Sequence, residues 1–433
     1  MPEHEFNEVL GLGRMKGFKT LIKVSEALER FRKAVVHRIE EAEEVELMDA
    51  LGRICAEDVK ALMDVPPYDR SAVDGYAIIA EDVFSASPMN PIKLKLVGRI
   101  LAGSASSTIP RIERGEAVEI MTGAPMPLNA NAVVMVEDVK VVENGIEVLK
   151  PVHPYQNVSR RGEDFKRGEI VIKRGVRVKP WHIGALASLN IRKLKVLRRP
   201  RISVLSTGDE LIEFGEELKP GKIINSTKPM LMALLLEEGC IPLDLGIAED
   251  DVDEIYSKIL TGLSESDGVI VTGGTSVGVK DLVPEAVKRL GEIVFHGLRM
   301  RPGKPTGAAV SAGKPIFMLS GFPVAAAIGF EVLVRPILAH MQRCTIEPRP
   351  KIRGIITRRV VNPPNTRSYV RVRVFESDDK VMVEPLRLTG SGILSSLTRG
   401  NGLLIIPEEL EGYDEGDIVE VELLQPIWRG DEK

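Results

Sequence analysis

The feature that most restricts the fold is a regular alternation of strands and helices between residues 201 and 341. Short, continuous apolar runs, typical of fully buried strands, are each followed by a longer run with helical spacing. The predicted strands cover 202–206, 241–247, 268–274 and 316–321, and the predicted helices cover 228–239, 251–263, 282–290 and 324–341. This order predicts a doubly wound α/β domain whose parallel sheet is covered on both faces. Sheets of this kind bind their ligands at the carboxyl ends of the strands.

The sequence on either side of this domain is rich in short strands separated by glycine and proline. Before it, strand-like runs fill most of residues 45–174, which predicts a β-rich region. After it, the alternation in residues 369–375 places Val370, Val372 and Val374 on one face of a strand. Further strand-like runs continue to residue 424, so we expect a compact sheet or a barrel of about five strands.

One helix is expected before the β-rich region, from Ser25 onwards. The serine hydroxyl is suited to capping free backbone N–H groups, and Leu28, Phe31 and Val35 share one face. This helix is expected to pack inside a domain or against a partner.

Length and composition limit the class of protein. A chain of 433 residues exceeds the roughly 250–300 at which one hydrophobic core stops growing, so several domains are expected. The net charge of −4 lacks the basic excess of nucleic-acid-binding proteins. Three widely spaced cysteines favour a reducing compartment, and no run of residues reads as a signal peptide or a membrane span. We therefore expect a cytoplasmic protein with no nucleic-acid or membrane partner.

Acidic side chains follow several predicted strands of the α/β domain. Glu210 follows the first strand, Asp250 and Asp251 follow the second, and Asp281 lies beyond the third. If these loops meet at one edge of the sheet, their carboxylates could bind Mg²⁺. The alternative is that the acids are ordinary helix N-terminal charges, which is the commoner case for adjacent acids. These two interpretations are about equally supported by the residues alone.

Two further loops of this domain are suited to anions. The segment 272–278 contains Gly273, Gly274 and Ser276, which could present N–H groups and a hydroxyl to a phosphate. The turn 299–305 holds three cations within six positions beside proline and glycine, a rigid arrangement suited to an oxyanion. A solvated basic turn is the alternative interpretation. Cations beside acids would form the divided site that a reaction of phosphate and metal requires.

Ordered motifs along nearly the whole chain resemble the molybdopterin molybdenumtransferase family, the MoeA proteins and the gephyrin E domain. The motifs are DRSAVDGYA at 69–77, EIMTGAPMP at 119–127, VMVED at 134–138, RRGEDFKRGE at 160–169, STGDEL at 206–211, GIAEDD at 246–251, TGGTSVG at 272–278, RPGKP at 301–305 and SGILSSLTRGNGL at 391–403. Any one of these could arise by chance, whereas the complete set in this order is specific.

The resemblance implies a homodimer of four-domain subunits and a particular reaction. The implied domains are an N-terminal dimerisation domain of residues 1–65 and 156–198, an inserted β-rich domain of 66–155, an α/β domain of 199–347 like the pterin adenylyltransferase MogA, and a C-terminal β-barrel domain of 348–433. The implied enzyme is a Mg²⁺-dependent transferase. It inserts molybdate into adenylylated molybdopterin, releases AMP, and has other cofactor-assembly enzymes as possible partners.

The resemblance also implies roles for single residues. Asp74 and Thr122 match positions important for activity, where they contact the cofactor from the second subunit. The acidic set of Glu210, Asp250, Asp251 and Asp281 is implied to hold Mg²⁺ and to orient the pterin phosphate, with Glu210 and Asp281 also counted as catalytic. The oxyanion-binding positions are implied to be Arg301, Lys304, Pro305, Arg371 and Ser391.

Two departures from the family pattern bear on the pocket. Arg301 stands where lysine is usual, which keeps the charge but changes the donor geometry. The usual LPGNPVS turn is here Leu319 to Ala325, LSGFPVA, without the asparagine and the final serine. Two other functions are weighed against the transferase: a pterin adenylyltransferase or nucleotide pyrophosphatase on the same α/β domain, and a non-catalytic scaffold. The choice between molybdate and tungstate is left open.

Overall fold

A computed structural model describes residues 21–104, 109–274, 282–386 and 390–429. The chain divides into two compact units. The first contains residues 1–43 and 197–433, and the second contains residues 44–196. Each unit is described by itself below, and the predicted four-domain boundaries remain a prediction.

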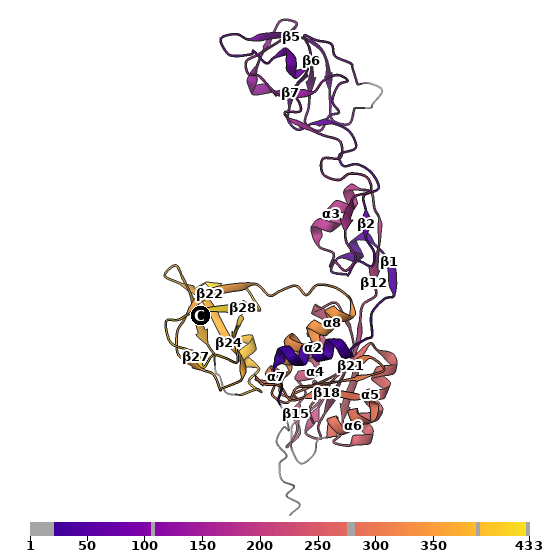
Figure 1. Cartoon of the computed structure of the whole chain (residues 1–433), viewed down its shortest axis with the longest axis vertical. Helices are drawn as coiled ribbons and strands as arrows, with labels where there is room; N and C mark the ends of the chain where they lie inside the picture. Colours follow the sequence, from indigo (N-terminus) through magenta and orange to yellow (C-terminus); the bar gives the residue numbers. More distant parts are fainter. Residues whose placement is uncertain (1–20, 105–108, 275–281, 387–389, 430–433) are drawn as a thin grey trace, which may run out of the picture. The chain divides into compact units, whose positions relative to one another are not determined.

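The first unit is built on a six-stranded sheet in the order β16-β13-β17-β21-β20-β18 (Figure 1). Its strands are β13 (Arg201–Thr207), β16 (Ile241–Ala248), β17 (Gly268–Thr272), β18 (Glu292–His296), β20 (Gly307–Ser311) and β21 (Lys314–Leu319). The four predicted strands are β13, β16, β17 and β21, and these pair in parallel. The predicted α/β fold is thus confirmed for the interior of the sheet.

One edge of the sheet departs from the predicted parallel arrangement. Strands β20 and β18 were not predicted, and both pair antiparallel to their neighbours. A tight hairpin joins β20 to β21, and its turn residues Ala312 and Gly313 both have positive φ. Most strand residues of β20 are small, so its sequence lacks the bulky apolar run that marks the interior strands.

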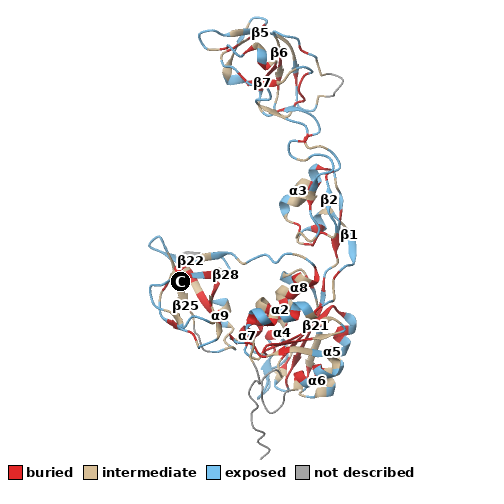
Figure 2. Cartoon of the chain, viewed as in Figure 1, coloured by how far each residue is buried: buried red, intermediate tan, exposed pale blue. Residues whose placement is uncertain are grey.

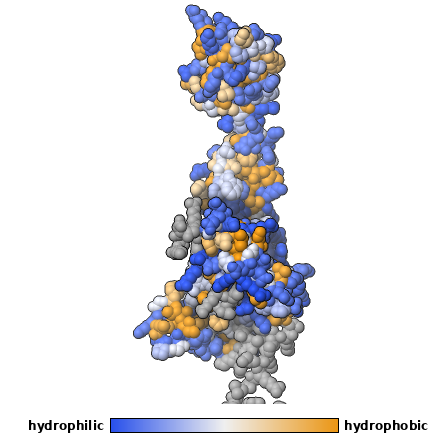
Figure 3. Space-filling view, turned by 90° about the vertical axis from the view of Figure 1, so that its left-hand side faces the viewer, coloured by the Kyte–Doolittle hydropathy of each residue, from blue (hydrophilic) through white to orange (hydrophobic). Residues whose placement is uncertain are grey.

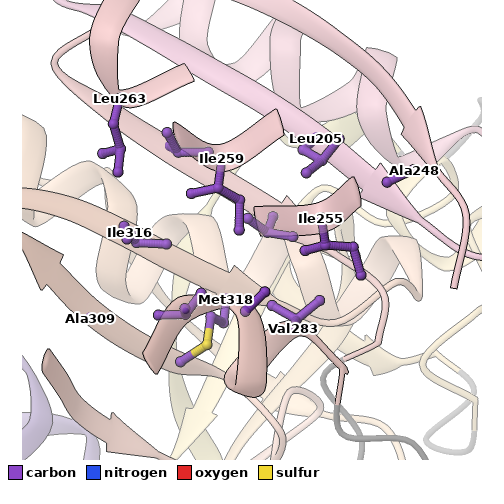
Figure 4. Close-up of a cluster of buried hydrophobic side chains, with 13 residues drawn as sticks. Leu205, Ala248, Ile255, Ile259, Leu263, Val283, Ala309, Ile316 and Met318 are labelled. Carbon is purple, nitrogen blue, oxygen red and sulfur yellow. The ribbon is translucent and has the colours of Figure 1, made fainter. Parts of the chain in front are cut away.

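Helices pack on the sheet and bury its apolar residues. They are α2 (Val24–Ala34), α4 (Thr227–Glu237), α5 (Val252–Glu265), α6 (Leu282–Leu290), α7 (Pro323–Gly329) and α8 (Arg335–Met341). Helices α5 and α6 pack against each other, whereas α4 packs against α7. Figure 4 shows Ile255 and Ile259 of α5 directed toward Leu205 and Met318 of the sheet. This core fixes the strand ends and the loops that follow them.

The predicted N-terminal helix exists, but its predicted cap was wrong. Helix α2 begins at Val24, one residue before Ser25, and its N-cap residue Lys23 makes no side-chain capping bond. The predicted packing inside a domain is confirmed, because the buried Phe31 ring meets Phe295 and Phe317 edge to face. Aromatic pairs in this geometry stabilise beyond the area they bury.

One helical stretch, Pro323–Met341, is long and apolar enough by length and composition to cross a membrane, although no such stretch was expected from the sequence. It comprises α7, a π-helical turn at Phe330–Val334, and α8. Inside the first unit, 67% of its most apolar window is buried. In Figure 2, the helices of the first unit carry red, buried segments. Burial of that extent is what the core helix of a folded domain requires.

A closed five-stranded barrel follows the α/β domain in the first unit. Its order is β24-β25-β22-β28-β26, closed by pairing of β26 with β24. The strands are β22 (Lys351–Ile356), β24 (Arg367–Ser377), β25 (Lys380–Pro385), β26 (Gly402–Ile406) and β28 (Ile418–Leu423), with short additions β23 (Val360–Val361), β27 (Gly412–Tyr413), β29 (Trp428–Arg429) and helix α9 (Ser395–Thr398). Val370, Val372 and Val374 lie in its core, so the predicted barrel is confirmed.

The second unit is β-rich, as predicted. Its main sheet has the order β7-β4-β6-β5-β9-β8. The elements are β1 (Ala42–Glu46), β2 (Val59–Lys60), β3 (Arg70–Ser71), β4 (Gly75–Ile78), β5 (Ile92–Ile100), β6 (Glu116–Ile120), β7 (Ala132–Met135), β8 (Val139–Val142), β9 (Gly145–Val148), β10 (Val158–Ser159), β11 (Ile170–Ile172), α3 (Pro180–Ser188) and β12 (Lys193–Leu197). On the face drawn in Figure 3, hydrophilic residues are interspersed with apolar ones.

Candidate functional site

A cleft of about 580 Å³ opens at the carboxyl ends of the parallel strands in the first unit. Clefts of this size suit a nucleotide-sized ligand. The lining residues are Thr207, Glu210, Leu211, Ile223, Ile224, Asn225, Ser226, Thr227, Thr272, Gly273, Gly274, Gly303, Pro305, Ser320, Gly321, Phe322, Pro323, Ala325, Ser391, Gly392 and Leu394. Residues of the α/β domain and of the barrel therefore share one cleft at the predicted edge of the sheet.

Glycines allow the strand ends to approach each other in the cleft. Gly273 has φ +89°, and a Cβ there would lie 2.2 Å from the carbonyl oxygen of Thr207. A Cβ on Gly321 would lie 3.3 Å from the Cα of Gly273. The first contact leaves no room for a side chain on Gly273, and the second is tight, so the loops after β17 and β21 meet backbone to backbone. Gly273 and Gly274 were predicted to bind substrate and do line the cleft, whereas Ser276 lies outside the described residues.

Two buried polar groups in the cleft wall have no hydrogen-bond partner among the described residues. They are Oγ1 of Thr207 and Nδ2 of Asn225, and both side chains are almost fully buried. Nearby, the hydroxyls of Ser206 and Thr272 pair with each other at 2.9 Å. Since an unpaired buried polar group is costly, unpaired groups that line a cleft point to a polar ligand. Sequence reasoning did not select Thr207 or Asn225.

The four predicted carboxylates have different surroundings. Glu210 lines the cleft. Asp251 caps helix α5, because its Oδ1 accepts a hydrogen bond from the N–H of Glu254 at 2.8 Å. The N–H of Asp250 donates to Asp209 Oδ1 at 2.9 Å. Asp281 lies outside the described residues.

Over the described residues, no three His, Cys, Asp or Glu side chains are grouped closely enough to hold a metal ion. The predicted magnesium site of Glu210, Asp250, Asp251 and Asp281 includes a residue outside the described ranges, so it stays a prediction. The helix-capping alternative describes Asp251 correctly.

Two of the predicted cations, Arg301 and Arg371, interact where the α/β domain joins the barrel. The short strand β19 (Met300–Arg301) pairs in parallel with β24, and this pairing sets Arg301 opposite Ser368. Arg371 of the same strand β24 is buried, and it donates hydrogen bonds to Ser396 Oγ at 3.1 Å and to the carbonyl of Tyr369 at 3.2 Å. Burial, and next the charge of Arg301, lower the pKa of Arg371. Two mutually repelling guanidinium groups favour an anion between them.

The other residues predicted to bind the oxyanion are Lys304, Pro305 and Ser391. Pro305 and Ser391 both line the cleft, and the carbonyl of Ser391 accepts a hydrogen bond from the N–H of Val324. The carbonyl of Lys304 accepts from the N–H of Leu298, which holds the turn against the preceding segment. Thus Pro305 and Ser391 are in the cleft wall, whereas the three cations are not among its described lining residues.

Asp74 and Thr122, predicted as catalytic, meet in the second unit. Both the N–H and the hydroxyl of Thr122 donate to Asp74 Oδ1 at 2.7 Å. These bonds, the backbone one first, lower the pKa of Asp74. The pair therefore presents an ionised carboxylate on a loop that its own hydrogen bonds hold in place.

A buried lysine beneath the cleft was missed by sequence reasoning. Lys228, in the first turn of α4, is 1% exposed and forms ion pairs with Glu213 at 2.5 Å and Asp244 at 2.7 Å. Its partners lie in the loop after β14 (Leu211–Ile212) and in β16. The charge in the first turn of an otherwise apolar helix was the available signal. Thr227 directly precedes Lys228, and Asn225 Oδ1 accepts a hydrogen bond from the Lys228 N–H at 3.2 Å, so the two ion pairs fix one wall of the cleft.

Models of three families match the chain in sequence order. The MoeA N-terminal region (domain I and II) matches residues 22–190, the probable molybdopterin binding domain matches residues 203–340, and the MoeA C-terminal region (domain IV) matches residues 353–424. The α/β domain with the cleft is thus of the molybdopterin-binding class.

Similar proteins share this arrangement over nearly their whole length. A relative from Methanocaldococcus jannaschii is 42% identical over 93% of this chain and 95% of its own. The molybdopterin molybdenumtransferase of Bacillus subtilis is 34% identical over 94% of this chain and 95% of its own. The crystal structure of a molybdopterin biosynthesis MoeA protein from Pyrococcus horikoshii has a TM-score of 0.81 at 33% identity, covering 93% of this chain and 100% of that one. The chain belongs to the MoeA family, which confirms the resemblance found in its motifs.

Proposed function

We propose that this protein is a molybdopterin molybdenumtransferase, which inserts molybdate into adenylylated molybdopterin and releases AMP during molybdenum-cofactor biosynthesis. The observation that carries the proposal is the cleft at the carboxyl edge of a molybdopterin-binding domain, in a chain that matches named molybdenumtransferases over 94% of its length. The protein is proposed to act in the cytoplasm.

The cleft offers separate surfaces for the parts of such a substrate. Gly273 and Gly274 line the cleft and have no side chains, so their backbone N–H groups are proposed to donate hydrogen bonds to phosphate oxygens. Thr207 and Asn225 supply unpaired polar atoms for the pterin nucleotide. Molybdate is a dianion, and its proposed site lies toward Arg301, Lys304 and Arg371, where two guanidinium groups repel each other until an anion is bound.

Magnesium is the ion implied by the family. Mg²⁺ is usually held by one or two carboxylates together with substrate phosphates and water, so a group of three acids is not required. Glu210 in the cleft wall fits this pattern, with Asp281 as the second candidate ligand outside the described residues. Asp250 and Asp251 are proposed to contribute negative charge to the metal site at the carboxyl ends of the strands. The ion would neutralise phosphate charge while the pyrophosphate bond is cleaved.

A homodimer remains part of the proposal, in which Asp74 and Thr122 of one subunit contact the substrate bound to the other. The hydrogen-bonded carboxylate of Asp74 is suited to accept bonds from the amino groups of a pterin. Other cofactor-assembly enzymes are proposed as partners that deliver the substrate. The proposal includes tungstate as an alternative oxyanion, because it has the charge and nearly the size of molybdate.

The direct test is AMP release. Purified protein with adenylylated molybdopterin, molybdate and Mg²⁺ should release AMP, measured by chromatography, in proportion to molybdenum bound by the pterin. Arg371→Met should reduce both products, whereas Arg359→Met is the matched control, because Arg359 is an exposed arginine of the barrel domain whose ion pair, with Asp414, is also exposed. No AMP above a protein-free control would refute the proposal. Consumption of ATP with unmodified molybdopterin would support the adenylyltransferase alternative instead.

A further inference from the structure

One aromatic side chain stands exposed within the cleft. Phe322 lies between β21 and α7, lines the cleft, and is 59% exposed. It occupies the altered turn, at the position where the family pattern has asparagine. Single exposed apolar residues are ordinary on protein surfaces, but Phe322 lies in a cleft wall, and aromatic side chains are typical of the lining of ligand sites.

The backbone holds this residue firmly. The N–H of Phe322 donates to Ser320 Oγ at 3.3 Å, and its carbonyl accepts from the N–H of Ala326 at 2.9 Å in the first turn of α7. With the backbone fixed, only two side-chain torsions remain free. A phenyl ring therefore offers a large flat surface at low entropic cost on binding.

The barrel supports one edge of the ring. A Cβ on Gly392 would lie 3.1 Å from Cδ1 and 3.5 Å from Cε1 of Phe322, so a larger residue at 392 would push the ring away by a few tenths of an ångström. The two loops are also joined by the bond between Val324 N–H and the Ser391 carbonyl at 3.1 Å. The glycine and the ring thus form one fitted contact between the α/β domain and the barrel loop.

We propose that Phe322 is a specificity-determining residue on which a planar nitrogen heterocycle of the substrate stacks, with Gly392 as the position that seats the ring. The proposal rests on the proposed function, which supplies two such heterocycles, a pterin and an adenine. Stacking on an aromatic face tolerates either ring. In this turn, an aromatic surface takes the place of a hydrogen-bonding amide.

Binding measurements test this directly. Dissociation constants for molybdopterin under anaerobic conditions, and separately for AMP, are measured by calorimetry with the full chain. Phe322→Leu should weaken binding of one of the two probes about tenfold. Phe322→Trp should retain the affinity, because it keeps the flat surface. Phe214→Leu is the matched control, since Phe214 is 66% exposed in the same unit but does not line the cleft.

A second variant separates stacking from a general loss of structure. Gly392→Ala should also weaken binding of the probe that Phe322→Leu affects. The loss of affinity should be smaller in the Phe322→Leu background, because the ring that the new methyl group displaces is absent. A loss for molybdopterin assigns the stacked ring as the pterin, and a loss for AMP assigns it as the adenine. Equal affinities of wild type and Phe322→Leu for both probes, in a protein that still releases AMP, overturn this inference and leave the proposed function intact. Wild type that binds neither probe and releases no AMP overturns both.

Discussion

The two ends of the parallel strands in the first unit differ in whether their buried polar groups have hydrogen-bond partners. Where β17 begins, Asp267 is surrounded by donors: Arg198 binds both oxygens at 2.7 and 2.8 Å, and the N–H of Arg201 and the ring of His37 add two bonds of 2.9 Å. Where the same strands end, Thr207 and Asn225 have unpaired polar atoms in the described structure. The first end is built for stability, and the second leaves hydrogen-bonding capacity for a ligand.

The largest expected effect is at the start of β17, where the buried carboxylate of Asp267 is hydrogen-bonded. Asp267→Ala should lower the free energy of unfolding by about 3 kcal/mol, because it removes one partner from a buried ion pair. Urea denaturation gives the value. Glu41→Ala is the control, since Glu41 binds the same Arg198 at 2.7 Å but its side chain is 77% exposed. Equal losses in the two variants would show that burial does not distinguish the two carboxylates.

The carboxylate of Asp267 also makes the free energy of unfolding depend on pH. Burial alone would raise the pKa of Asp267, but hydrogen bonds from Arg198, Arg201 and His37 lower it to about 2 from 3.8. A depressed folded-state pKa stabilises the protein above pH 3.8, and this stabilisation is lost as the pH falls toward 2. The loss should be about 2 kcal/mol. The stability difference between wild type and Asp267→Asn should therefore narrow across this range, and a constant difference would contradict the assignment.

The sequence predicts the interior of the sheet better than its antiparallel edge, for a physical reason. Strands β13, β17 and β21 are covered on both faces and consist largely of apolar residues, so pattern alone identifies them. Strand β20 consists largely of small residues because the neighbouring side chains leave little space for larger ones. A Cβ on Gly307 would lie 2.7 Å from Cε of Met318. Such a constraint comes from a neighbour that is distant in sequence.

The same distinction holds within the candidate site. Spacing at strand ends was enough to select Glu210, Gly273 and Gly274, which line the cleft. Ser391 and Arg371 came only from the family resemblance, because their place depends on how the barrel packs on the α/β domain. That the Thr207 hydroxyl has no partner among the described residues is a property of its surroundings, which no sequence pattern records.

Like-charge repulsion near the ligand-binding end provides the next test. Arg301→Met should weaken molybdate binding about tenfold, because one of the two guanidinium groups proposed to bind the anion is lost. It should not lower the free energy of unfolding, since it relieves repulsion on Arg371. Calorimetry with molybdate and urea denaturation measure the two quantities. A loss of both affinity and stability would mean that Arg301 supports the fold, as Arg198 does at the other end.

The smallest effect is the most direct comparison of paired and unpaired hydroxyls within one strand. In β13, Ser203 Oγ pairs with Ser266 Oγ at 3.0 Å, whereas Thr207 Oγ1 has no partner among the described residues. Ser203→Ala should cost about 1 kcal/mol of unfolding free energy, because it removes a hydrogen bond made within the fold. Thr207→Val keeps the shape of the side chain and should leave stability unchanged or slightly increased. It should instead weaken substrate binding about fivefold, the value of one neutral hydrogen bond. If Thr207→Val destabilises the fold as Ser203→Ala does and leaves substrate binding unchanged, the unpaired hydroxyl serves the fold and not the ligand.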